Sequence, residues 1–441
     1  MSSESTSSIN DSSSRPLNVA IIGGGIGGLS LLIGLLHNAN LNVIKPHIYE
    51  AAAKFSEIGA GVGFGPNAIE SMRVVSPEFQ QRFFAMATDA DPEVVNGVEV
   101  PVWNEMRMGM DGKSEKCPLK AGDVITKVCF SAWKKNVHRA HFLDEMVSML
   151  PGGTGEGFVT FGKRCTDIQD GEGGKGVVIK FADGMEAEAD AVIGCDGVKS
   201  RVRPILLRKI GDEEGINPRF SGKYAYRGLI PIDEAVATIG DVAKRSHMWY
   251  GYDGHFVCFP FDGKWESQDW VLPATVEEAL EDFVDWPDNI RKMVQSLQKP
   301  DKWMLFEHPP AKSYCDEAGK ICLLGDCAHA STPHHGAGAG MAIEDSAVLS
   351  RLLGALEQPD PRALAAAFRS YDTARRVRTQ KLVTTSRDAA LLYEFQTPGI
   401  LDDIEKVRKN VQERLRWIWD LDVEQHCMEA VNRLKEEVKL L

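Results

Sequence analysis

The sequence predicts an α/β fold in which a β-α-β unit near the N-terminus begins a parallel sheet. Residues Asn18 to Ile22 are mostly apolar and β-branched, as expected of a buried strand. Three glycines follow with G-x-G-x-x-G spacing, namely Gly23, Gly25 and Gly28. The segment from Leu29 to Leu36 is apolar on nearly all sides, which predicts a buried helix, and Glu50 ends the next strand.

Each part of this unit has a mechanical role in holding a dinucleotide. The first glycine allows a tight turn, the second lets the backbone approach a pyrophosphate, and the third lets helix and strand pack closely. The helix N-terminus offers free N–H groups and a positive dipole end to the phosphates. A carboxylate about 20 residues further on, here Glu50, accepts hydrogen bonds from ribose hydroxyls. The ordered combination therefore predicts a dinucleotide site without saying which dinucleotide it is.

Two later stretches each show an apolar strand that ends in glycine and aspartate. Ala191 to Ile193 precede Gly194-Cys195-Asp196-Gly197, and Ile321 to Leu324 precede Gly325-Asp326. A glycine-rich loop, Pro333 to Gly340, follows the second stretch. Because nucleotide-binding pieces lie at the start, near residue 190 and near residue 325, the two insertions between them are predicted to form a separate sheet.

Proline and apolar spacing define several other elements. Pro46 has no N–H, so Leu41 to Lys45 are predicted to leave the first helix as a loop, with the next strand at His47 to Glu50. Pro361 to Leu392 and Ile404 to Leu440 are predicted to be helical. The second of these has apolar residues at spacings of three and four that form one face: Ile404, Val407, Val411, Leu415 and Ile418.

Length, charge and cysteine content limit the class of protein. A chain of 441 residues exceeds what one core usually supports, so two domains or one composite are expected. The net charge of −13 argues against a nucleic-acid surface. Nine scattered cysteines without a C-x-x-C pair fit reduced thiols inside a cell, and no metal site is predicted. Residues 1–15 are predicted to be a disordered leader, and the longest apolar run is too short to cross a bilayer. A cytoplasmic protein is expected.

Three motifs together resemble one family, the single-component flavin-dependent aromatic hydroxylases. They are the N-terminal G-x-G-x-x-G, the D-G motif in GCDGVKSRVR, and the G-D motif in LLGDCAHASTPHHGAGAGMAIED. Within that family the chain is most similar to salicylate hydroxylases, through EIGAGVGFGPNAI, SGKYAYRGLIP, YDGHFVCFP and TPHHGAGAGMAIEDSAVLSRLL. The resemblance implies FAD and NAD(P)H as cofactors.

The resemblance also implies a domain plan of the p-hydroxybenzoate hydroxylase type. A Rossmann-type FAD-binding domain (16–85, 130–205 and 318–390) is interleaved with a mixed β-sheet substrate domain (86–129 and 206–317), and C-terminal helices follow (391–441). The exposed face of these helices is a candidate interface for a homodimer.

The family's cofactor-binding residues transfer to matching positions in this sequence. Glu50 is expected at the adenosine ribose, Arg139 at the FAD phosphates or ribityl chain, and Asp326 at the ribityl hydroxyls. Asp196 serves FAD and NAD(P)H, unless it only caps the following helix, and Arg139 is alternatively a solvated helix residue. The full expected set is Gly23, Gly25, Gly28, Glu50, Gly63, Arg139, Asp196, Asp326, Gly338 and Ala339.

Three residues are candidates for contact with the substrate. Arg227 lies among apolar strand residues, where a guanidinium needs a partner. That partner is either an internal carboxylate or the substrate's carboxylate or phenolate. His334, just before the glycine-rich loop, is a candidate proton carrier or a structural support for the loop. Tyr250 is either a second group for the phenol proton or ordinary sheet packing.

The function implied is monooxygenation of a phenolic acid by O2 through a C4a-hydroperoxyflavin. Salicylate-type decarboxylative hydroxylation to a catechol is the first hypothesis, and dearomatising hydroxylation of an alkylated phenol, as in fungal-type secondary metabolism, is the alternative. One departure from the family supports a third hypothesis, a non-catalytic or uncoupled flavoprotein. The family usually has an apolar strand after Lys264, whereas this sequence has a polar run that leads to Trp270.

Overall fold

A parallel sheet of five strands organises one end of the molecule. The computed structural model describes residues 15–55, 61–89, 93–95, 98–100, 102–129, 135–258 and 271–441. The strand order is β10-β2-β1-β14-β20, and every neighbouring pair is parallel. The strands are β1 (Leu17–Ile22), β2 (Ile44–Tyr49), β10 (Val159–Thr160), β14 (Ala191–Gly194) and β20 (Ile321–Leu323). The strands that precede the three glycine motifs, β1, β14 and β20, thus lie side by side in one sheet although they are far apart in sequence.

The position of Pro46 corrects the predicted start of the second strand. Pro46 lies inside β2, opposite Val19 of β1. The amides of Ile48 and Glu50 donate towards the β10 side, to the carbonyls of Phe158 and Thr160. By the two-residue period of a strand, the nitrogen of Pro46 points to the same side. Since β10 pairs only with Ile48 and Tyr49, no ladder bond is lost there, and the strand tolerates the proline.

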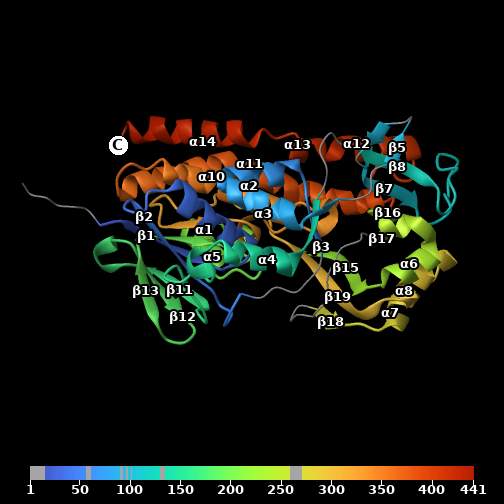
Figure 1. Ribbon diagram of the computed structural model, residues 1–441, viewed down its shortest axis with the longest axis horizontal. Coiled ribbons are helices and arrows are strands. Elements are labelled where there is room, and N and C mark those ends of the chain that lie inside the picture. The colour runs from blue at the N-terminus through green and yellow to red at the C-terminus, as the bar shows by residue number, and fades with distance from the viewer. Residues whose placement is uncertain are drawn as a thin grey trace, which may run out of the picture.

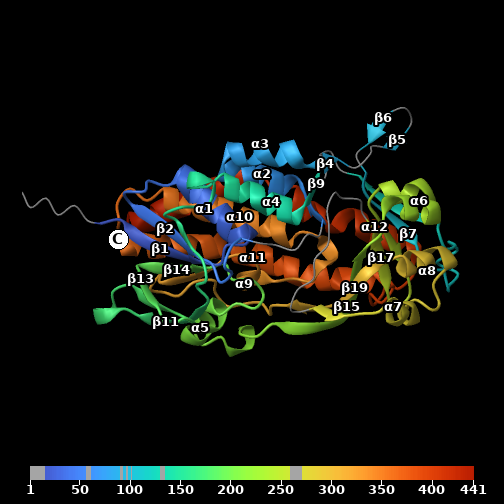
Figure 2. The same ribbon diagram turned by 60° about the horizontal axis from the view of Figure 1, so that its bottom comes forward.

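Helices on both faces cover this sheet and form the largest core. Helices α1, α2 and α10 pack against one another, and α11 and α14 lie on α10 (Figures 1 and 2). Helix α5 packs against β20 and β11. These helices are α1 (Ile26–Asn38), α2 (Pro66–Val75), α3 (Pro77–Met86), α4 (Arg139–Ser148), α5 (Val202–Lys209), α9 (Asp326–His329), α10 (Gly338–Gly354) and α11 (Pro361–Tyr393).

The other end of the molecule contains two further sheets. One has the order β17-β16-β7-β8 and the other the order β15-β19-β18. Their strands are β7 (Val102–Met108), β8 (Val124–Cys129), β15 (Arg219–Leu229), β16 (His247–Tyr250), β17 (His255–Cys258), β18 (Val271–Pro273) and β19 (Gln298–Glu307). Three short helices accompany them, α6 (Ile232–Ile239), α7 (Val276–Asp282) and α8 (Asp288–Gln295), at the right in Figure 1. The sequence predicted that a strand is missing after Lys264. Residues 265–270 lie outside the described residues, so this stays a prediction.

Three small sheets and several 3-10 turns complete the described chain. The sheets are β11-β12-β13, β3-β9-β4 and β5-β6. Their strands are β3 (Gly61–Phe64), β4 (Thr88–Asp89), β5 (Glu93–Val95), β6 (Val98–Val100), β9 (Lys135–His138), β11 (Cys165–Asp170), β12 (Val177–Phe181) and β13 (Glu186–Ala189). The 3-10 turns are Pro151–Gly153, Glu172–Gly174, Glu213–Gly215, Gly240–Lys244 and Pro333–His335.

The C-terminal region is helical but is not one helix. It forms α12 (Ile404–Arg414), α13 (Arg416–Trp419) and α14 (Val423–Val438). The break follows from capping, since the Asp422 carboxylate accepts a hydrogen bond from the Gln425 amide and starts α14 anew. The predicted apolar face is confirmed, because all five of its residues are buried: Ile404, Val407, Val411, Leu415 and Ile418.

The predicted domain boundaries and the homodimer stay predictions. All strands of the parallel sheet fall in segments assigned to cofactor binding, and β7, β8, β15 to β19 fall in segments assigned to the substrate. Of the predicted leader, only Arg15 is described, and its guanidinium pairs with Asp190 at 2.6 Å. In the described parts of the chain, no helix has the length and apolar character needed to span a bilayer.

Candidate active site

One large cavity, of about 2440 Å³, joins the parallel sheet to the sheets at the other end. Its walls come from the carboxyl ends of β1, β2 and β14, from the G-D loop before α10, and from β15, β16, β17 and β19. Ligand sites for one small molecule usually occupy about 300–1,000 Å³. The cavity is therefore large enough for an extended cofactor together with a substrate.

In the first glycine motif, a side chain would have free space at the second glycine, Gly25, but not at the third, Gly28. A Cβ on Gly28 would clash with the carbonyl oxygen of Gly23, so close packing of β1 and α1 requires glycine. Gly23 itself has φ of +105°, a conformation that other residues rarely adopt. By contrast, a Cβ on Gly25 would have no heavy atom within 4 Å. The backbone at Gly25 thus faces the cavity directly, at the N-terminus of α1.

Glu50 is held rigidly beside this turn. One carboxylate oxygen accepts a hydrogen bond from the Gly24 amide at 2.6 Å, and the other accepts one from the Ala52 amide at 2.7 Å. Both oxygens keep further lone pairs for hydroxyl donors, because a carboxylate accepts about four hydrogen bonds. The side chain lines the cavity, as a ribose-binding carboxylate must.

The G-D motif and the glycine-rich loop meet at the N-terminus of α10. Asp326 begins α9 and lines the cavity, and a Cβ on Gly338 would lie 3.8 Å from its Oδ1. Gly338 and Ala339 form the first turn of α10, which has no side-chain cap. The uncapped N–H groups and the positive dipole end therefore face the cavity, close to a carboxylate that accepts hydroxyl donors.

Asp196 forms the contacts expected of a helix cap. Its carboxylate accepts hydrogen bonds from the Ser200 hydroxyl at 2.6 Å and from the Arg201 and Val202 amides at 2.6 and 3.2 Å. Burial raises the pKa of this carboxyl, and the three donors oppose the increase. Asp196 also lines the cavity, so capping does not exclude the predicted contact with the cofactors.

Arg203 ties the D-G motif to the G-D motif. Its side chain is fully buried and donates only to backbone carbonyls, those of Gly215, Pro309, Cys327 and Ala328, at 2.6–3.1 Å. Two of these acceptors belong to α9, which begins with Asp326. The guanidinium therefore fixes the position of the Asp326 carboxylate relative to the strand end at Asp196.

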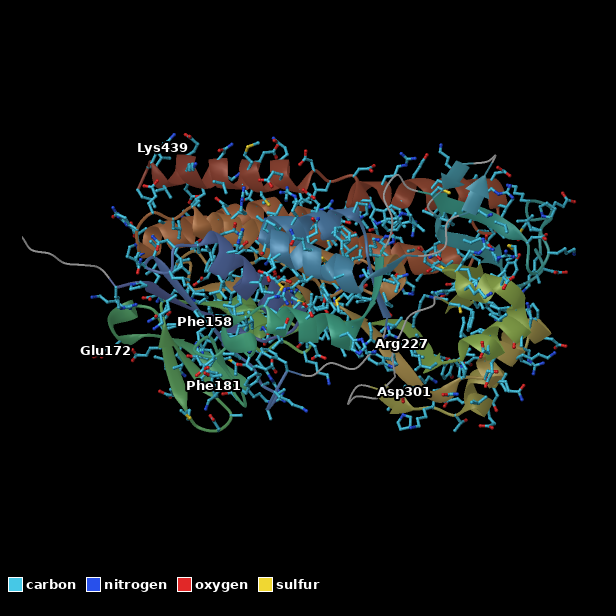
Figure 3. The ribbon with its side chains drawn as sticks, viewed as in Figure 1. Phe158, Glu172, Phe181, Arg227, Asp301 and Lys439 are labelled. Atoms are coloured by element: carbon cyan, nitrogen blue, oxygen red, sulfur yellow. The ribbon has the colours of Figure 1, made fainter. Side chains whose placement is uncertain are left out.

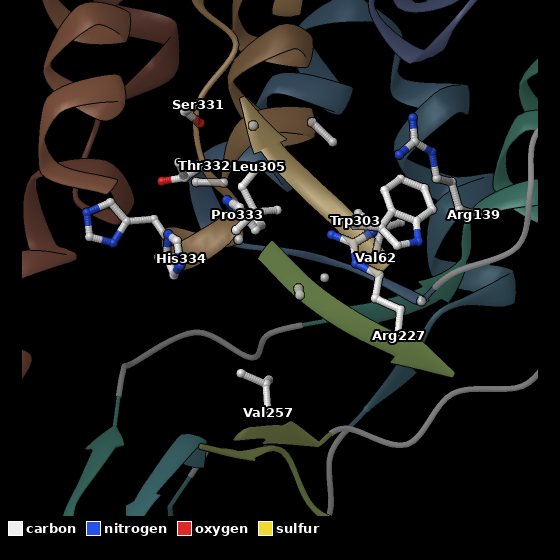
Figure 4. A pocket seen from close by; sticks show the side chains of 18 of the residues that line it. Val62, Arg139, Arg227, Val257, Trp303, Leu305, Ser331, Thr332, Pro333 and His334 are labelled. Carbon is white, nitrogen blue, oxygen red and sulfur yellow. The ribbon is translucent and has the colours of Figure 1, made fainter. Parts of the chain in front are cut away.

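Two arginines lie together on the wall of the cavity. Arg227, on β15, projects between the two ends of the molecule, with its guanidinium 4.3 Å from the ring centre of Trp303 (Figure 3). Burial and the charge of Arg139 lower the pKa of Arg227 to about 10. Among the described residues, no carboxylate forms an ion pair with Arg227. Figure 4 shows Arg139, Arg227 and Trp303 grouped on one side of the pocket and Thr332, Pro333 and His334 on the other. The first side is a positively charged wall that favours an anion.

His334 is buried at the opposite side and is neutral. Its Nδ1 has no hydrogen-bond partner among the described residues, and its backbone carbonyl accepts from the Tyr393 hydroxyl at 3.1 Å. Burial, together with the nearby His255 and Lys223, lowers the pKa of His334 to about 2. The imidazole therefore accepts a proton poorly at neutral pH, although it remains able to contact a bound ring.

Comparison with known proteins identifies the family. A family model described as "FAD binding domain" matches residues 267–386. The chain is 39% identical to 6-methylsalicylate 1-monooxygenase atA of Aspergillus terreus, over 97% of this chain and 94% of that protein. It is 33% identical to salicylate hydroxylase of Pseudomonas putida, over 95% of each chain. Among solved structures, a salicylate hydroxylase substrate complex matches with a TM-score of 0.78 and 30% identity, over 95% of this chain and 98% of that chain.

The chain belongs to the FAD-dependent aromatic monooxygenases. The predicted family, the α/β FAD-binding fold with its parallel sheet and C-terminal helices, and the enzyme class are thereby confirmed. FAD is the cofactor, and NAD(P)H is the reductant typical of this family.

The residues of this monooxygenase fit FAD. Two uncapped helix N-termini, those of α1 and α10, open onto the same cavity, and each favours negative charge. The open space at Gly25 accommodates a phosphate close to the backbone. Gly63, on β3, also lines the cavity. Every predicted cofactor-binding position from Gly23 to Ala339 except Gly28, whose role is packing, borders the cavity.

Tyr250 is the one predicted substrate-contacting residue that does not border the monooxygenase cavity. Its ring packs in the core against Tyr393 and Phe395, with ring centres 5.0 and 6.0 Å away. Its hydroxyl is buried without a hydrogen-bond partner among the described residues, and burial raises its pKa. The sheet-packing alternative fits this placement better than contact with a substrate.

Three residues on the cavity wall of the monooxygenase were not among the predicted site residues. Lys223, His255 and Glu394 meet there from β15, from β17 and from the end of α11. The His255 ring nitrogen Nδ1 lies 3.1 Å from Glu394 Oε1, and Lys223 pairs with Glu394 Oε2. These positions are up to 171 residues apart, so no local spacing links them. Lys223 and His255 lie in SGKYAYRGLIP and YDGHFVCFP, two segments that carry the resemblance, but nothing there singles them out, and no sequence pattern marks Glu394.

Proposed function

We propose that the protein hydroxylates a salicylate-type acid at the carbon that bears the carboxylate, giving a catechol and CO2. One atom of O2 enters the ring and the other leaves as water. The bond from the ring to the carboxylate breaks, and NAD(P)H supplies the electron pair. The relatives named as salicylate hydroxylase and 6-methylsalicylate 1-monooxygenase support this substrate class.

The observation that carries the proposal is the pair of arginines on one wall of the cavity. Arg227 is a half-buried cation, and burial and the neighbouring charge of Arg139 both lower its pKa, so its charged form is destabilised. A bound carboxylate relieves both penalties by charge-assisted hydrogen bonds with the planar guanidinium. The ring of Trp303 then provides an apolar surface beside the acid group. A phenol without an acid group would offer Arg227 no such carboxylate.

The cofactor-binding residues complete the assignment. Gly25 and the first turn of α1 are proposed to bind the pyrophosphate, Glu50 the adenosine ribose, and Asp326 the ribityl hydroxyls. Gly338 and Ala339 would donate N–H groups to the ring of the flavin, where negative charge develops on reduction. FAD, when bound, would accept electrons from NAD(P)H and activate O2. The protein positions the substrate ring and excludes water from this chemistry.

Product analysis tests the proposal. Purified enzyme loaded with FAD would be given NADH or NADPH with salicylate, 6-methylsalicylate, or an alkylated phenol that lacks a carboxylate. We expect catechol or 3-methylcatechol, with CO2 and NAD(P)+ in equal amounts. A dearomatised dienone from the alkylated phenol, without turnover of either acid, would replace the proposal by the dearomatising alternative.

Hydrogen peroxide would be measured in the same experiment. Peroxide equal to the NAD(P)H consumed, without catechol, would support the uncoupled alternative that the sequence after Lys264 raised.

A further inference from the structure

One buried carboxylate on α10 holds both ends of the short helix α9. Asp345 Oδ2 accepts a hydrogen bond from the Gly325 amide at 3.1 Å, and it lies 2.5 Å from His329 Nε2. Gly325 is the residue before α9, and His329 is its last residue. The other oxygen, Oδ1, accepts a hydrogen bond from Arg375 Nε at 2.7 Å. Helices α9, α10 and α11 therefore meet at this fully buried side chain (Figure 2).

Asp345 is ionised in this position. Burial raises the pKa of its carboxyl, but His329 and Arg375 outweigh burial and lower it to about 2. An ionised carboxylate only accepts hydrogen bonds, so His329 donates from Nε2. Because two donors at opposite ends of α9 bond to one charged oxygen, this turn has little freedom to shift against α10.

The turn held in this way carries Asp326. Asp326 is the first residue of α9 and lines the cavity. No described residue donates a hydrogen bond to its carboxylate, so the position of the carboxylate depends on the backbone of the turn. Gly325, just before it, has φ of +70°, and Arg203 donates to two carbonyls of α9. Asp345 supplies the contacts on the α10 side of the same turn.

Asp345 also belongs to the helix that begins at the cavity. Gly338 and Ala339 form the first turn of α10, about two helical turns before Asp345. A Cβ on Gly338 would lie 3.8 Å from Asp326 Oδ1. The contact between α10 and α9 therefore fixes the separation between the Asp326 carboxylate and the first N–H groups of α10. These are the two parts of the site proposed to bind the ribityl chain and the flavin ring.

We propose that Asp345 is a positioning residue for FAD. It holds the Asp326 carboxylate and the first turn of α10 at the separation that the ribityl hydroxyls and the flavin ring require when both are bound at once. The inference rests on the proposed contact of Asp326 with the ribityl chain. Asp345 does not itself border the cavity, so it acts only through the elements that it joins.

The affinity for FAD in a double-mutant cycle tests this role. Apoprotein would be titrated with FAD, and quenching of flavin fluorescence would give the Kd of the wild type, Asp345→Asn, Asp326→Asn and the double variant. Each single substitution is expected to raise Kd about tenfold, because each removes or misaligns a charge-assisted hydrogen bond. If Asp345 acts through Asp326, the double variant should bind FAD within about twofold of Asp326→Asn. Effects that multiply, to about 100-fold, would overturn the proposal.

Glu344→Gln is the matched control. Glu344 precedes Asp345 on α10, is equally buried, and pairs with the same arginine, Arg375, at 2.8 Å. It bonds to Asn67 and Arg378 rather than to α9. Its loss is expected to destabilise the fold as well, but to change the Kd of FAD by less than about twofold. An increase in Kd equal to that of Asp345→Asn would show that the whole network only supports the fold, which would contradict the proposal.

His329→Leu provides a second test if Asp345→Asn does not fold. It removes one donor at the end of α9 but keeps the ion pair between Asp345 and Arg375. We expect a raised Kd for FAD in His329→Leu and its recovery in His329→Gln, whose amide N–H can donate to Asp345. The visible circular dichroism of the bound flavin should change and recover in the same two variants. An unchanged Kd and spectrum in His329→Leu would refute the positioning role.

The cycle also separates this inference from the proposed site. If Asp326→Asn binds FAD as tightly as the wild type, the proposed contact of Asp326 with the ribityl chain is wrong, and the inference fails with it. If Asp326→Asn weakens binding but Asp345→Asn does not, only the inference is wrong. Neither result depends on the substrate, because the binding of FAD is measured without one.

Discussion

Arg227 is the residue whose surroundings say most about the substrate. It is a half-buried cation beside a second cation, and its pKa of about 10 still leaves it protonated at neutral pH. Below about pH 10, Arg227 can pair with an acid group. The pairing weakens as pH rises through the pKa of Arg227. The charge is thus available from acidic pH, where a benzoate first ionises, up to about pH 10.

Replacing this arginine should weaken binding of the acid selectively. Arg227→Gln is expected to raise the Kd of salicylate about 10- to 100-fold, since hydrogen bonds to charged groups contribute about 1.5–3 kcal/mol. Arg227→Lys should recover part of the affinity, because it restores the charge but not the planar fork. Quenching of flavin fluorescence would measure both values, with phenol as the control ligand. An equal loss of affinity for phenol would show that Arg227 only supports the fold.

At the scale of elements, α10 and α11 are joined by a buried charge network. Glu344 and Asp345 of α10 face Arg375 of α11, which is 2.8 Å from one carboxylate and 2.7 Å from the other. His329 also bonds to Asp345. Burial raises the pKa of both carboxyls, but Arg375 and Arg378 outweigh burial at Glu344, and His329 and Arg375 outweigh it at Asp345. The pKa of each carboxyl is thereby lowered to about 2. The helix that presents its N-terminus to the cavity is therefore anchored by ionised groups.

This network should make the protein sensitive to acid. A carboxyl whose pKa is lowered on folding adds stability that is complete above its unfolded pKa of about 4 and is lost as pH falls towards 2. For Glu344 and Asp345 together, the free energy of unfolding is expected to decrease by about 5 kcal/mol between pH 4 and pH 2. Urea unfolding at a series of pH values measures this slope.

Two glutamate variants check its origin. Glu344→Gln should reduce the slope between pH 4 and 2, because glutamine does not titrate. Glu436→Gln, at an exposed ion pair with Lys439, should leave it unchanged. Identical slopes in all three proteins would assign the acid sensitivity to other groups.

The elements themselves differ in how well the sequence predicts them. The strand, glycine turn and helix from Leu17 to Leu36 follow from local spacing, and they lie as expected. Pro46 was misjudged because the tolerance of a proline in a strand depends on how far the neighbouring strand extends, which is a tertiary property. Tyr250 was placed on a strand correctly, but its side chain contacts α11, which no local pattern reveals. His255 and Glu394 were missed for the same reason.

At the scale of the whole molecule, the cavity is where distant segments meet. The glycine turn after β1, the end of β14, the loop before α10 and the strands β15 and β17 all border it. A ligand that fills this space contacts all of them at once. Binding of FAD to the folded chain should therefore stabilise the entire protein by mass action, by about 2.7 kcal/mol when free FAD is 100 times Kd.

Thermal unfolding with and without FAD tests this coupling. The Tm of the wild type is expected to rise by several degrees and to depend on FAD concentration. Gly25→Ala should leave the Tm of the apoprotein unchanged, because its methyl group meets no protein atom, and should abolish most of the rise by occupying the space next to the cofactor. A lower Tm of the Gly25→Ala apoprotein would mean that this glycine serves packing instead.

The late position of β20 in the sequence has a consequence for synthesis on the ribosome. The G-x-G-x-x-G turn emerges early, but β20 and the first turn of α10 lie beyond residue 320, as do two of the carbonyls that hold Arg203. Until they are translated, β14 is an open edge of the sheet and Arg203 lacks half of its acceptors. The nascent chain therefore lacks part of the cavity wall until about three quarters of it has been made, and during that time its open strand edge is exposed to aggregation.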